Sequence, residues 1–278
     1  MKRRVAAAAI AALVACLAFA LCACTEPYDP NASMKEPSVD ESALKDPGVL
    51  HVGVNADSYP LAGQADQRWY GLEVDIAAAV GQELGLKVEF VDVGDDTVGA
   101  LAGDEVDMVM GVEADASKGQ CWRSAGYAPS CIALFSMKEK AKLPTREKGQ
   151  VVAVQTSSLA EWLVSRQLGE GSVQSEDDVK AAFQQLADGA VKYAAADAVV
   201  GAYVVNKMGI DAYIIGVMQV PDTYCIGIAE DNHKLQKAVK KAMSSIKGNG
   251  VFDIILEKWT GGPVDVSNAR QTDGAGIA

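Results

Sequence analysis

With 278 residues, the chain is long enough for one large domain or two medium-sized domains. Its composition, 49% hydrophobic and 22% charged, excludes a disordered, fibrous or disulfide-dense protein. The formal net charge is −12, or −15 without the basic residues Lys2, Arg3 and Arg4 near the N-terminus. Because nucleic acids and anionic lipid headgroups repel so acidic a chain, neither is expected as a partner surface.

The chain begins with a basic stretch, MKRR, followed by nineteen uncharged residues, VAAAAIAALVACLAFALCA. This pattern predicts an export signal over residues 1–23. The end of the run, LCAC, resembles the lipobox of bacterial lipoproteins, which implies cleavage before Cys24 and lipidation of that cysteine. An uncleaved signal anchor is the alternative, because the run is close to the length that spans a bilayer. Both interpretations place the rest of the chain outside the cytoplasm.

Residues 24–47 predict a flexible tether, because they contain four prolines and no apolar periodicity. After the tether, short β-branched runs alternate with helical patterns, as in the helix expected over 71–84, where Leu72, Ile76 and Val80 repeat every four residues. The expected strands are 49–55, 87–93, 106–112, 151–155, 172–175 and 191–197, and the other helices are 158–168 and 177–189. Such alternation predicts parallel sheets in an α/β protein.

Two stretches of the chain echo each other: LAGDEVDMVMG (101–111) and LADGAVKYAAA (186–196) each lead from a helix through a polar turn into a buried strand. This echo suggests two similar lobes. Ligands of open parallel sheets lie beyond the carboxyl ends of the strands. We therefore expect the site near Gly111 to Glu113 in one lobe and near Asp197 in the other.

The order of motifs from Gly48 to Gly261 resembles the extracellular solute-binding proteins of family 3, the polar amino-acid receptors of ABC importers. The matching stretches include GVLHVGVNADSYPL, GLEVDIAAAVGQELGLKVEFVDV, ALAGDEVDMVMGV, VAVQTSSLAEWL, AAADAVVGAYVV and the final YCIGIAEDNHKLQKAVKKAMSSIKGNGVFDIILEKWTG. The resemblance implies a two-lobed, periplasmic-binding-protein-like type II fold, each lobe a mostly parallel sheet flanked by helices. The implied parts are lobe 1 (48–130 and 224–261), lobe 2 (131–223), two crossing segments near 128–133 and 221–226, and a flexible tail (262–278) outside the fold.

The same resemblance implies a lipid-anchored receptor on the extracytoplasmic face of the cell membrane. It would act as a monomer, bind an amino acid or another amine-containing small solute by clamshell closure, and deliver it to an ABC permease. Two alternatives remain open: an extracytoplasmic lyase or dehydratase on the same fold, and a sensor lipoprotein that transports nothing.

Several site positions of lobe 1 depart from the family pattern. Lys118 stands where the family has the arginine that grips the α-carboxylate of the ligand, and Glu113 replaces a hydroxyl residue that helps to bind it. Gly94 falls where an aromatic side chain stacks on the ligand. The first loop offers Asp57 and Tyr59.

Lobe 2 keeps more of the pattern. Asp197 matches the family's acceptor for the ligand ammonium, and Ser157 and Ser158 open a helix whose free N–H groups suit an anion. Helix capping is the alternative role for all three residues. The pattern as a whole predicts that amines bind better than free carboxylates.

No catalytic residue, cofactor or metal site is expected. His51 and His233 are the only histidines, and neither a phosphate-binding glycine loop nor an HExxH motif occurs. Glu113 is the one candidate acid or base for the enzyme alternative.

Beyond Cys24 the chain contains three further cysteines, Cys121, Cys131 and Cys225, in a compartment expected to be oxidising. Cys131 and Cys225 fall at the crossing segments, which the resemblance places side by side, whereas Cys121 and Cys131 would close a short loop. A disulfide from Cys131 to Cys225 or to Cys121 is therefore expected, with its partner open.

Overall fold

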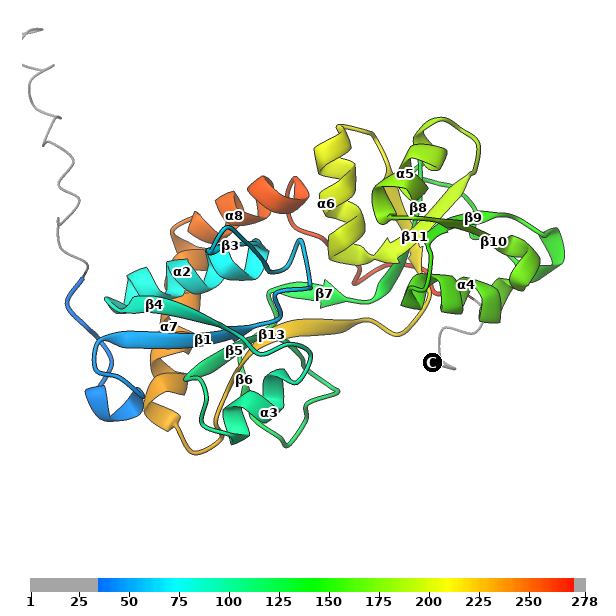
Figure 1. Cartoon of the computed structure of the whole chain (residues 1–278). Helices are drawn as coiled ribbons and strands as arrows, with labels where there is room; N and C mark the ends of the chain where they lie inside the picture. Colours follow the sequence, from blue (N-terminus) through cyan, green and yellow to red (C-terminus); the bar gives the residue numbers. More distant parts are fainter. Residues whose placement is uncertain (1–34, 273–278) are drawn as a thin grey trace, which may run out of the picture. The chain divides into compact units, whose positions relative to one another are not determined.

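The computed structural model describes residues 35–272 and contains two larger sheets, each with helices packed against its faces (Figure 1). The first sheet has the strand order β4-β1-β5-β13-β6, and β7 also pairs with β13. Its strands are β1 (Val49–Val54), β4 (Lys87–Asp92), β5 (Met108–Glu113), β6 (Trp122–Arg123), β7 (Ala128–Ser130) and β13 (Asp222–Ile228). A small hairpin, β2 (Gly63–Ala65) with β3 (Arg68–Tyr70), lies outside this sheet.

The second sheet has the strand order β10-β9-β11-β8-β12. Its strands are β8 (Ile132–Ser136), β9 (Val152–Gln155), β10 (Val173–Glu176), β11 (Tyr193–Asp197) and β12 (Tyr213–Val217). In each sheet three strands run parallel, as expected: β4, β1 and β5 in one, and β10, β9 and β11 in the other. The sheets are mixed, however, because β13 and β8 join them antiparallel.

Helices cover both sheets. Those of the first lobe are α2 (Leu72–Leu84), α3 (Thr97–Ala102), α7 (His233–Gly248) and α8 (Val251–Thr260), and those of the second are α4 (Leu159–Leu168), α5 (Val179–Ala187) and α6 (Ala198–Met208). Short 3-10 turns occur at η1 (Glu41–Ala43), η2 (Arg146–Lys148) and η3 (Glu170–Ser172). Among residues 35–272 no helix is long and apolar enough to cross a membrane.

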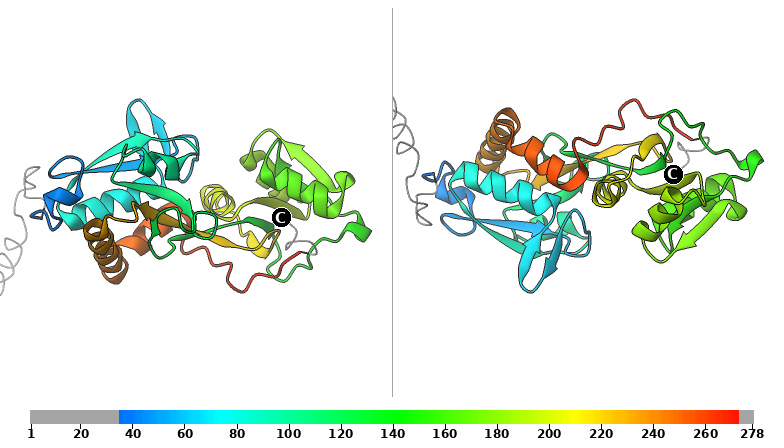
Figure 2. Two further views of the ribbon diagram at one scale, coloured as in Figure 1. Left: turned by 90° about the horizontal axis from the view of Figure 1, so that it is seen from below. Right: turned by 90° about the horizontal axis from the view of Figure 1, so that it is seen from above.

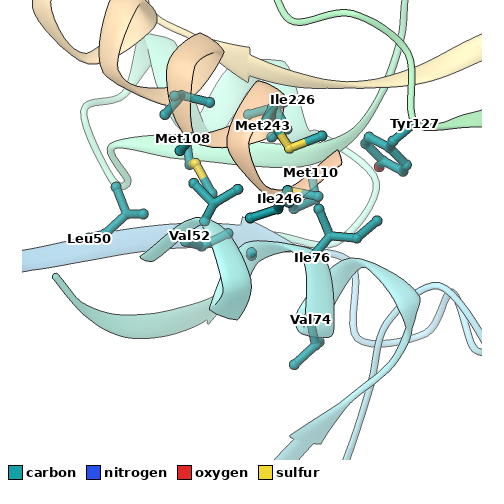
Figure 3. Close-up of a cluster of buried hydrophobic side chains, with 14 of the residues drawn as sticks. Leu50, Val52, Val74, Ile76, Met108, Met110, Tyr127, Ile226, Met243 and Ile246 are labelled. Carbon is teal, nitrogen blue, oxygen red and sulfur yellow. The ribbon is translucent and has the colours of Figure 1, made fainter. Parts of the chain in front are cut away.

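The largest core lies in the first lobe, between the sheet and helices α2, α7 and α8. Figure 3 shows its centre, where Val52, Met108 and Ile226 from the strands meet Ile76 and Ile246 from the helices. The second sheet is apolar on both faces, with one cluster against α5 and α6 and another against α4. This two-sided burial explains why its strands read as continuous apolar runs such as VVAV and YAAA.

Two of the chain segments that connect the lobes lie beside each other. The first runs from β7 into β8, and the second runs from β12 into β13. Residues Asp222 to Tyr224 of β13 pair antiparallel with Ser130 to Ala128 of β7. Because this ladder continues the first sheet toward the second lobe, it places Tyr224 and Ser130 between the two sheets.

The expectation of a flexible tether is wrong for residues 35–47. Val39 and Ala43 are buried in the core of the first lobe. Backbone bonds fix the segment further: Ser38 N–H donates to the Leu84 carbonyl at 2.9 Å, and Lys45 N–H donates to Asp107 Oδ1 at 2.8 Å. Two isolated apolar residues gave no periodic signal, although they suffice to anchor the segment. Residues 24–34 lie outside the described part of the chain.

The expectation that residues after Gly261 lie outside the fold is also wrong as far as residue 272. Figure 2 shows this segment, in red, running from α8 to the second lobe. Val266 is buried in the α6 cluster, and Val217 of β12 exchanges backbone hydrogen bonds with Arg270 and Thr272 at 2.9 and 3.0 Å. The segment thereby covers the free edge of β12.

Candidate ligand-binding site

A cavity of about 450 Å³ opens at the carboxyl ends of β1, β4 and β5, where the sheet topology predicts a ligand site. Polar side chains from each strand end contribute to it. They are Asn55 and Ser58 after β1, Asp95 and Asp96 after β4, Glu113 at the end of β5, and Ser117 and Gln120 beyond it. Glu73 from α2 and Tyr224 from β13 complete the polar lining.

A second cavity, of about 280 Å³, lies at the corresponding edge of the second sheet. Gln155 follows β9, Asp197 ends β11, and Ser158 opens α4. Glu113 and Tyr224 line both cavities, so the two spaces adjoin at these side chains. All described residues belong to one compact unit. We refer to the two spaces together as the cleft.

Asp197 combines a structural and a chemical role in the cleft. Its Oδ1 caps α6 by accepting the N–H groups of Val199 at 2.9 Å and Val200 at 3.1 Å. Burial raises the pKa of this carboxyl group to about 6, and the nearby charge of Glu113 adds to the effect, while the cap bonds oppose it. The cap uses Oδ1, and the Tyr224 hydroxyl group also bonds to this carboxyl group. An ionised carboxylate has about four lone-pair sites, so acceptor capacity remains for a ligand.

Glu113 lies directly across from Tyr224 in the β5–β13 ladder. Its Oε1 accepts a hydrogen bond from the Ser130 hydroxyl group of β7. The Tyr224 hydroxyl group lies close to both Ser130 and Asp197. The strands that connect the lobes therefore hold a tyrosine between two carboxylates at the floor of the cleft.

A third carboxylate enters from α2. Glu73 is 2% exposed, and burial raises its pKa to about 7 although the Tyr127 hydroxyl group donates to its Oε1. That hydroxyl also accepts the Gly111 N–H at 2.8 Å, and the Tyr127 ring stacks on Tyr224 with centroids 6.5 Å apart. Glu73 and the Glu113–Asp197 pair thus border the same tyrosine stack.

Three residues predicted from the sequence line the cleft: Glu113, Asp197 and Ser158. The Ser158 hydroxyl group serves as the α4 cap, accepting from Glu161 N–H at 3.1 Å and donating to the Gln155 carbonyl at 2.6 Å. Ser157 is exposed, has a φ of 58°, and donates its N–H to Glu161 Oε2 at 2.7 Å. Ser157 borders a separate surface hollow beside Trp162 instead of the cleft.

Three other predicted residues line neither cavity. Lys118 is exposed on a turn after β5, and Asp57 is exposed with its N–H bonded to Asn55 Oδ1 at 2.9 Å. Tyr59 is 45% exposed and packs edge-on against the rings of Tyr203, at 5.2 Å, and Tyr70. The guanidinium group of Arg123 donates to the Ala114 carbonyl and borders a different hollow.

The cleft is acidic throughout. Its lining includes five carboxylates and, in the described part of the chain, no lysine, arginine or histidine; the acids are Glu73, Asp95, Asp96, Glu113 and Asp197. None of the five takes part in an ion pair within residues 35–272. No described group of three or more acids, cysteines or histidines is arranged to hold a metal ion. The acidic lining therefore suits a cation better than an anion.

The sequence model of one protein family, the bacterial extracellular solute-binding proteins, family 3, matches residues 50–262 of this chain. The chain belongs to this family. The L-cystine-binding protein TcyJ of Escherichia coli strain K12 is 26% identical over 230 residues, which cover 80% of this chain and 86% of the relative.

Solved structures of the same type agree with the family. An ancestral cationic amino acid solute-binding protein, AncCDT-1, is 25% identical with a TM-score of 0.62, covering 77% of this chain and 96% of that one. A polar amino acid ABC uptake transporter substrate-binding protein from Streptococcus thermophilus has a TM-score of 0.67 at 18% identity, covering 78% and 88%. The two-lobed type II fold expected from the sequence is thereby confirmed.

In this family 3 protein, sequence reasoning missed two central residues of the cleft. Glu73 sits on the buried stripe of α2 with Ile76, Ala77 and Val80, so a charged residue within an apolar helical pattern was the available signal. Tyr224 carried no signal of its own, because its position depends on the pairing of β13 with β7.

The structure of this solute-binding protein contradicts the expected disulfide. Cys121, Cys131 and Cys225 are buried free thiols. Cys131 belongs to a core of the second lobe, whereas Cys121 belongs to a core of the first, so the two do not share a cluster. Burial raises the pKa of Cys131 to about 12, which keeps the thiol protonated and unreactive. Cys24 lies outside the described residues.

Proposed function

We propose that this chain is the lipid-anchored substrate-binding protein of an ABC importer, and that it captures an amino acid or another small amine-bearing solute by closing its lobes. The observation that carries the proposal is the position of Asp197 and Glu113, which come from different lobes and meet at Tyr224. An ammonium group bound there would be held from both sides of the cleft. The names of the relatives, which include cystine and cationic amino acid receptors, support this solute class.

The N-terminal organisation forms part of the proposal. Residues 1–23 would be removed, lipid on Cys24 would hold the protein at the extracytoplasmic face of the membrane, and residues 24–34 would act as the leash. The remainder would bind its solute as a monomer, with lobe 1 formed by 48–130 and 224–261 and lobe 2 by 131–223, and would present it to a permease. The short leash follows from the packing of Val39 and Ala43 on the first lobe.

Replacing Cys24 tests the anchor. In cells, Cys24→Ala should either release the protein into the soluble fraction or leave the uncut precursor, while Cys22→Ala should stay in the membrane fraction as a matched control. Mass spectrometry of the wild-type protein should show a lipid-modified Cys24 as the first residue. An intact segment from Met1 to Ala23 would contradict this part of the proposal.

A ligand screen tests capture. We expect an amino acid or amine to stabilise the mature protein, by about 2.7 kcal/mol at a hundredfold excess over its Kd, and to reduce its radius of gyration in X-ray scattering. Asp197→Asn should weaken binding at least tenfold, because a charge-assisted hydrogen bond contributes about 1.5–3 kcal/mol, while the amide oxygen can still cap α6. The exposed Asp177→Asn is the control. Chemical turnover of a bound compound would favour the lyase or dehydratase alternative instead.

A further inference from the structure

We propose that the solute is a small organic cation with two positively charged nitrogen centres and no free carboxylate group. One centre would bind between Asp197 and Glu113, and the other at Glu73. This inference rests on the proposed function, since it names the solute class of the same cleft.

The negative charge of the cleft lining is the first reason to expect a solute without a carboxylate group. A zwitterionic amino acid would place its carboxylate among five acids, with no cationic side chain in the described lining to offset them. The two nearest candidates do not serve: Lys118 is exposed outside both cavities, and Arg123 is bonded to the Ala114 carbonyl. Repulsion between like charges would oppose such a ligand.

Helix N-termini are the other elements that could receive a carboxylate. Five of them contribute a cap or first-turn residue to the cleft lining. Four have side-chain caps: Asp96 on α3, Ser158 on α4, Asp178 on α5 and Asp197 on α6. At α2 the first N–H groups donate to the Pro60 and Leu61 carbonyls at 3.0 and 2.9 Å. The three aspartate caps add negative charge where an anion would otherwise bind.

Glu73 is the reason to expect a second cationic centre in the solute. This residue is enclosed yet lines the first cavity, and of its two oxygens only Oε1 accepts the Tyr127 hydroxyl group. No other hydrogen bond to this carboxyl group occurs in the described part of the chain, and Glu73 contributes to the lining of the first cavity. A buried carboxylate at a cavity wall with acceptor capacity to spare fits an ammonium donor.

The stacked rings of Tyr127 and Tyr224 set the spacing between the two centres. Glu73 borders Tyr127, whereas Glu113 and Asp197 border Tyr224, and the ring centroids are 6.5 Å apart. A short, flexible diamine could bring one ammonium to each end while its methylene groups lie along the apolar and aromatic lining. A metal ion does not fit, because no described cluster has a metal-binding arrangement.

Calorimetry on the mature chain tests the inference with 1,4-diaminobutane, butylamine, 4-aminobutyrate and ornithine as probes. We expect the diamine to bind at least tenfold more tightly than each of the other three, and its affinity to fall with added salt. Glu73→Gln should reduce the preference for diamine over butylamine toward unity while leaving butylamine affinity within about twofold, since an ammonium bond contributes tenfold or more. Asp197→Asn should weaken both amines, and Asp177→Asn neither.

A proton measurement keeps the test independent of how well the Glu73 variant folds. Near neutral pH, Glu73 of the free protein holds part of a proton, and a bound ammonium would expel it. The titratable groups facing it are Tyr127 and Tyr224, whose pKa values burial raises further above neutrality, so they stay protonated. Binding of diamine should therefore release more protons than binding of butylamine, which displaces only the smaller share that Asp197 holds. The difference is measured as heat that depends on the buffer.

Two outcomes would overturn the inference. Tighter binding of ornithine or another free amino acid than of the diamine would refute it and leave the proposed receptor function standing. Equal affinities for diamine and butylamine, with equal proton release, would refute the second cationic centre. Failure of every amine and every amino acid to bind would reject the inference and the proposed solute class together.

Discussion

The buried carboxyl group of Glu73 should make the stability of the unliganded protein depend on pH. Burial holds its pKa at about 7, against 4.5 when it is unperturbed. Between these values the folded state binds a proton that the unfolded state does not, so the free energy of unfolding rises as the pH falls from about 7 to about 4.5. The difference corresponds to about 3 kcal/mol, since one pKa unit is about 1.4 kcal/mol.

Glu73→Gln removes this contribution while leaving an amide oxygen that can accept the Tyr127 hydroxyl group. At pH 8 the variant should match or exceed the wild type in stability, because a buried charge has been removed. At pH 4.5 its advantage should be smaller by about 3 kcal/mol. Asp197, with a pKa of about 6, titrates in both proteins and cancels in the difference.

Urea unfolding at a series of pH values measures the effect. The quantity to follow is the difference in unfolding free energy between variant and wild type, with the exposed Glu105→Gln as a control that should show no such trend. A difference that stays constant between pH 4.5 and pH 8 would refute the assignment of a raised pKa to Glu73.

Two further perturbations address contacts between the lobes. Tyr203→Phe removes the hydroxyl contact between Tyr203 and Tyr59 and should lower the unfolding free energy by about 1 kcal/mol in thermal or urea unfolding. Tyr59→Phe should lower it by the same amount. The double variant should lose no more stability than either single variant, because both remove the same contact. Deleting residues 263–278 should destabilise the protein by about 2–4 kcal/mol in calorimetric unfolding, because it exposes the surface that Val266 covers and unpairs Val217.

Much of the fold could be predicted because the local patterns and the tertiary structure agree. Apolar runs rich in β-branched residues mark some of the parallel strands, such as β1 and β9, and α2 carries the expected stripe of Ile76 and Val80. The antiparallel strands were harder, since β6 and β7 are two and three residues long and owe their conformation to β13. Short segments of this kind are fixed by their partners and not by their own sequence.

Near both ends of the described chain, too, partner surfaces and not the local sequence pattern determine which residues are buried. Val39, Ala43 and Val266 are isolated apolar residues in polar surroundings, so no periodicity distinguishes them from tether or tail. Each is nevertheless buried, because the first lobe and the edge of β12 provide complementary surfaces. Sequence patterns report repeated burial, whereas a single anchoring contact becomes visible only with its partner surface.

Two of the candidate site residues that line the cleft were predicted from their position at strand ends. Glu113 and Asp197 end parallel strands and line the cleft, as the topology requires. Asp57 and Tyr59 were assigned to the first loop by position alone, and the loop turns both away from the cavity, where Asn55 and Ser58 contribute instead. A loop shorter than ten residues can present either face, and the sequence does not indicate which.

Capping and ligand binding need not compete at Asp197. The cap bonds to Oδ1 fix the side-chain rotamer, so the carboxyl group keeps its orientation in the absence of ligand. The cap bonds also lower the pKa of the carboxyl group against the burial that raises it, which favours the charged form that an ammonium requires. The capping role of Asp197 therefore supports its binding role. The N–H groups at the start of α6 keep the carboxylate oriented and ionised for a cation that enters the cleft.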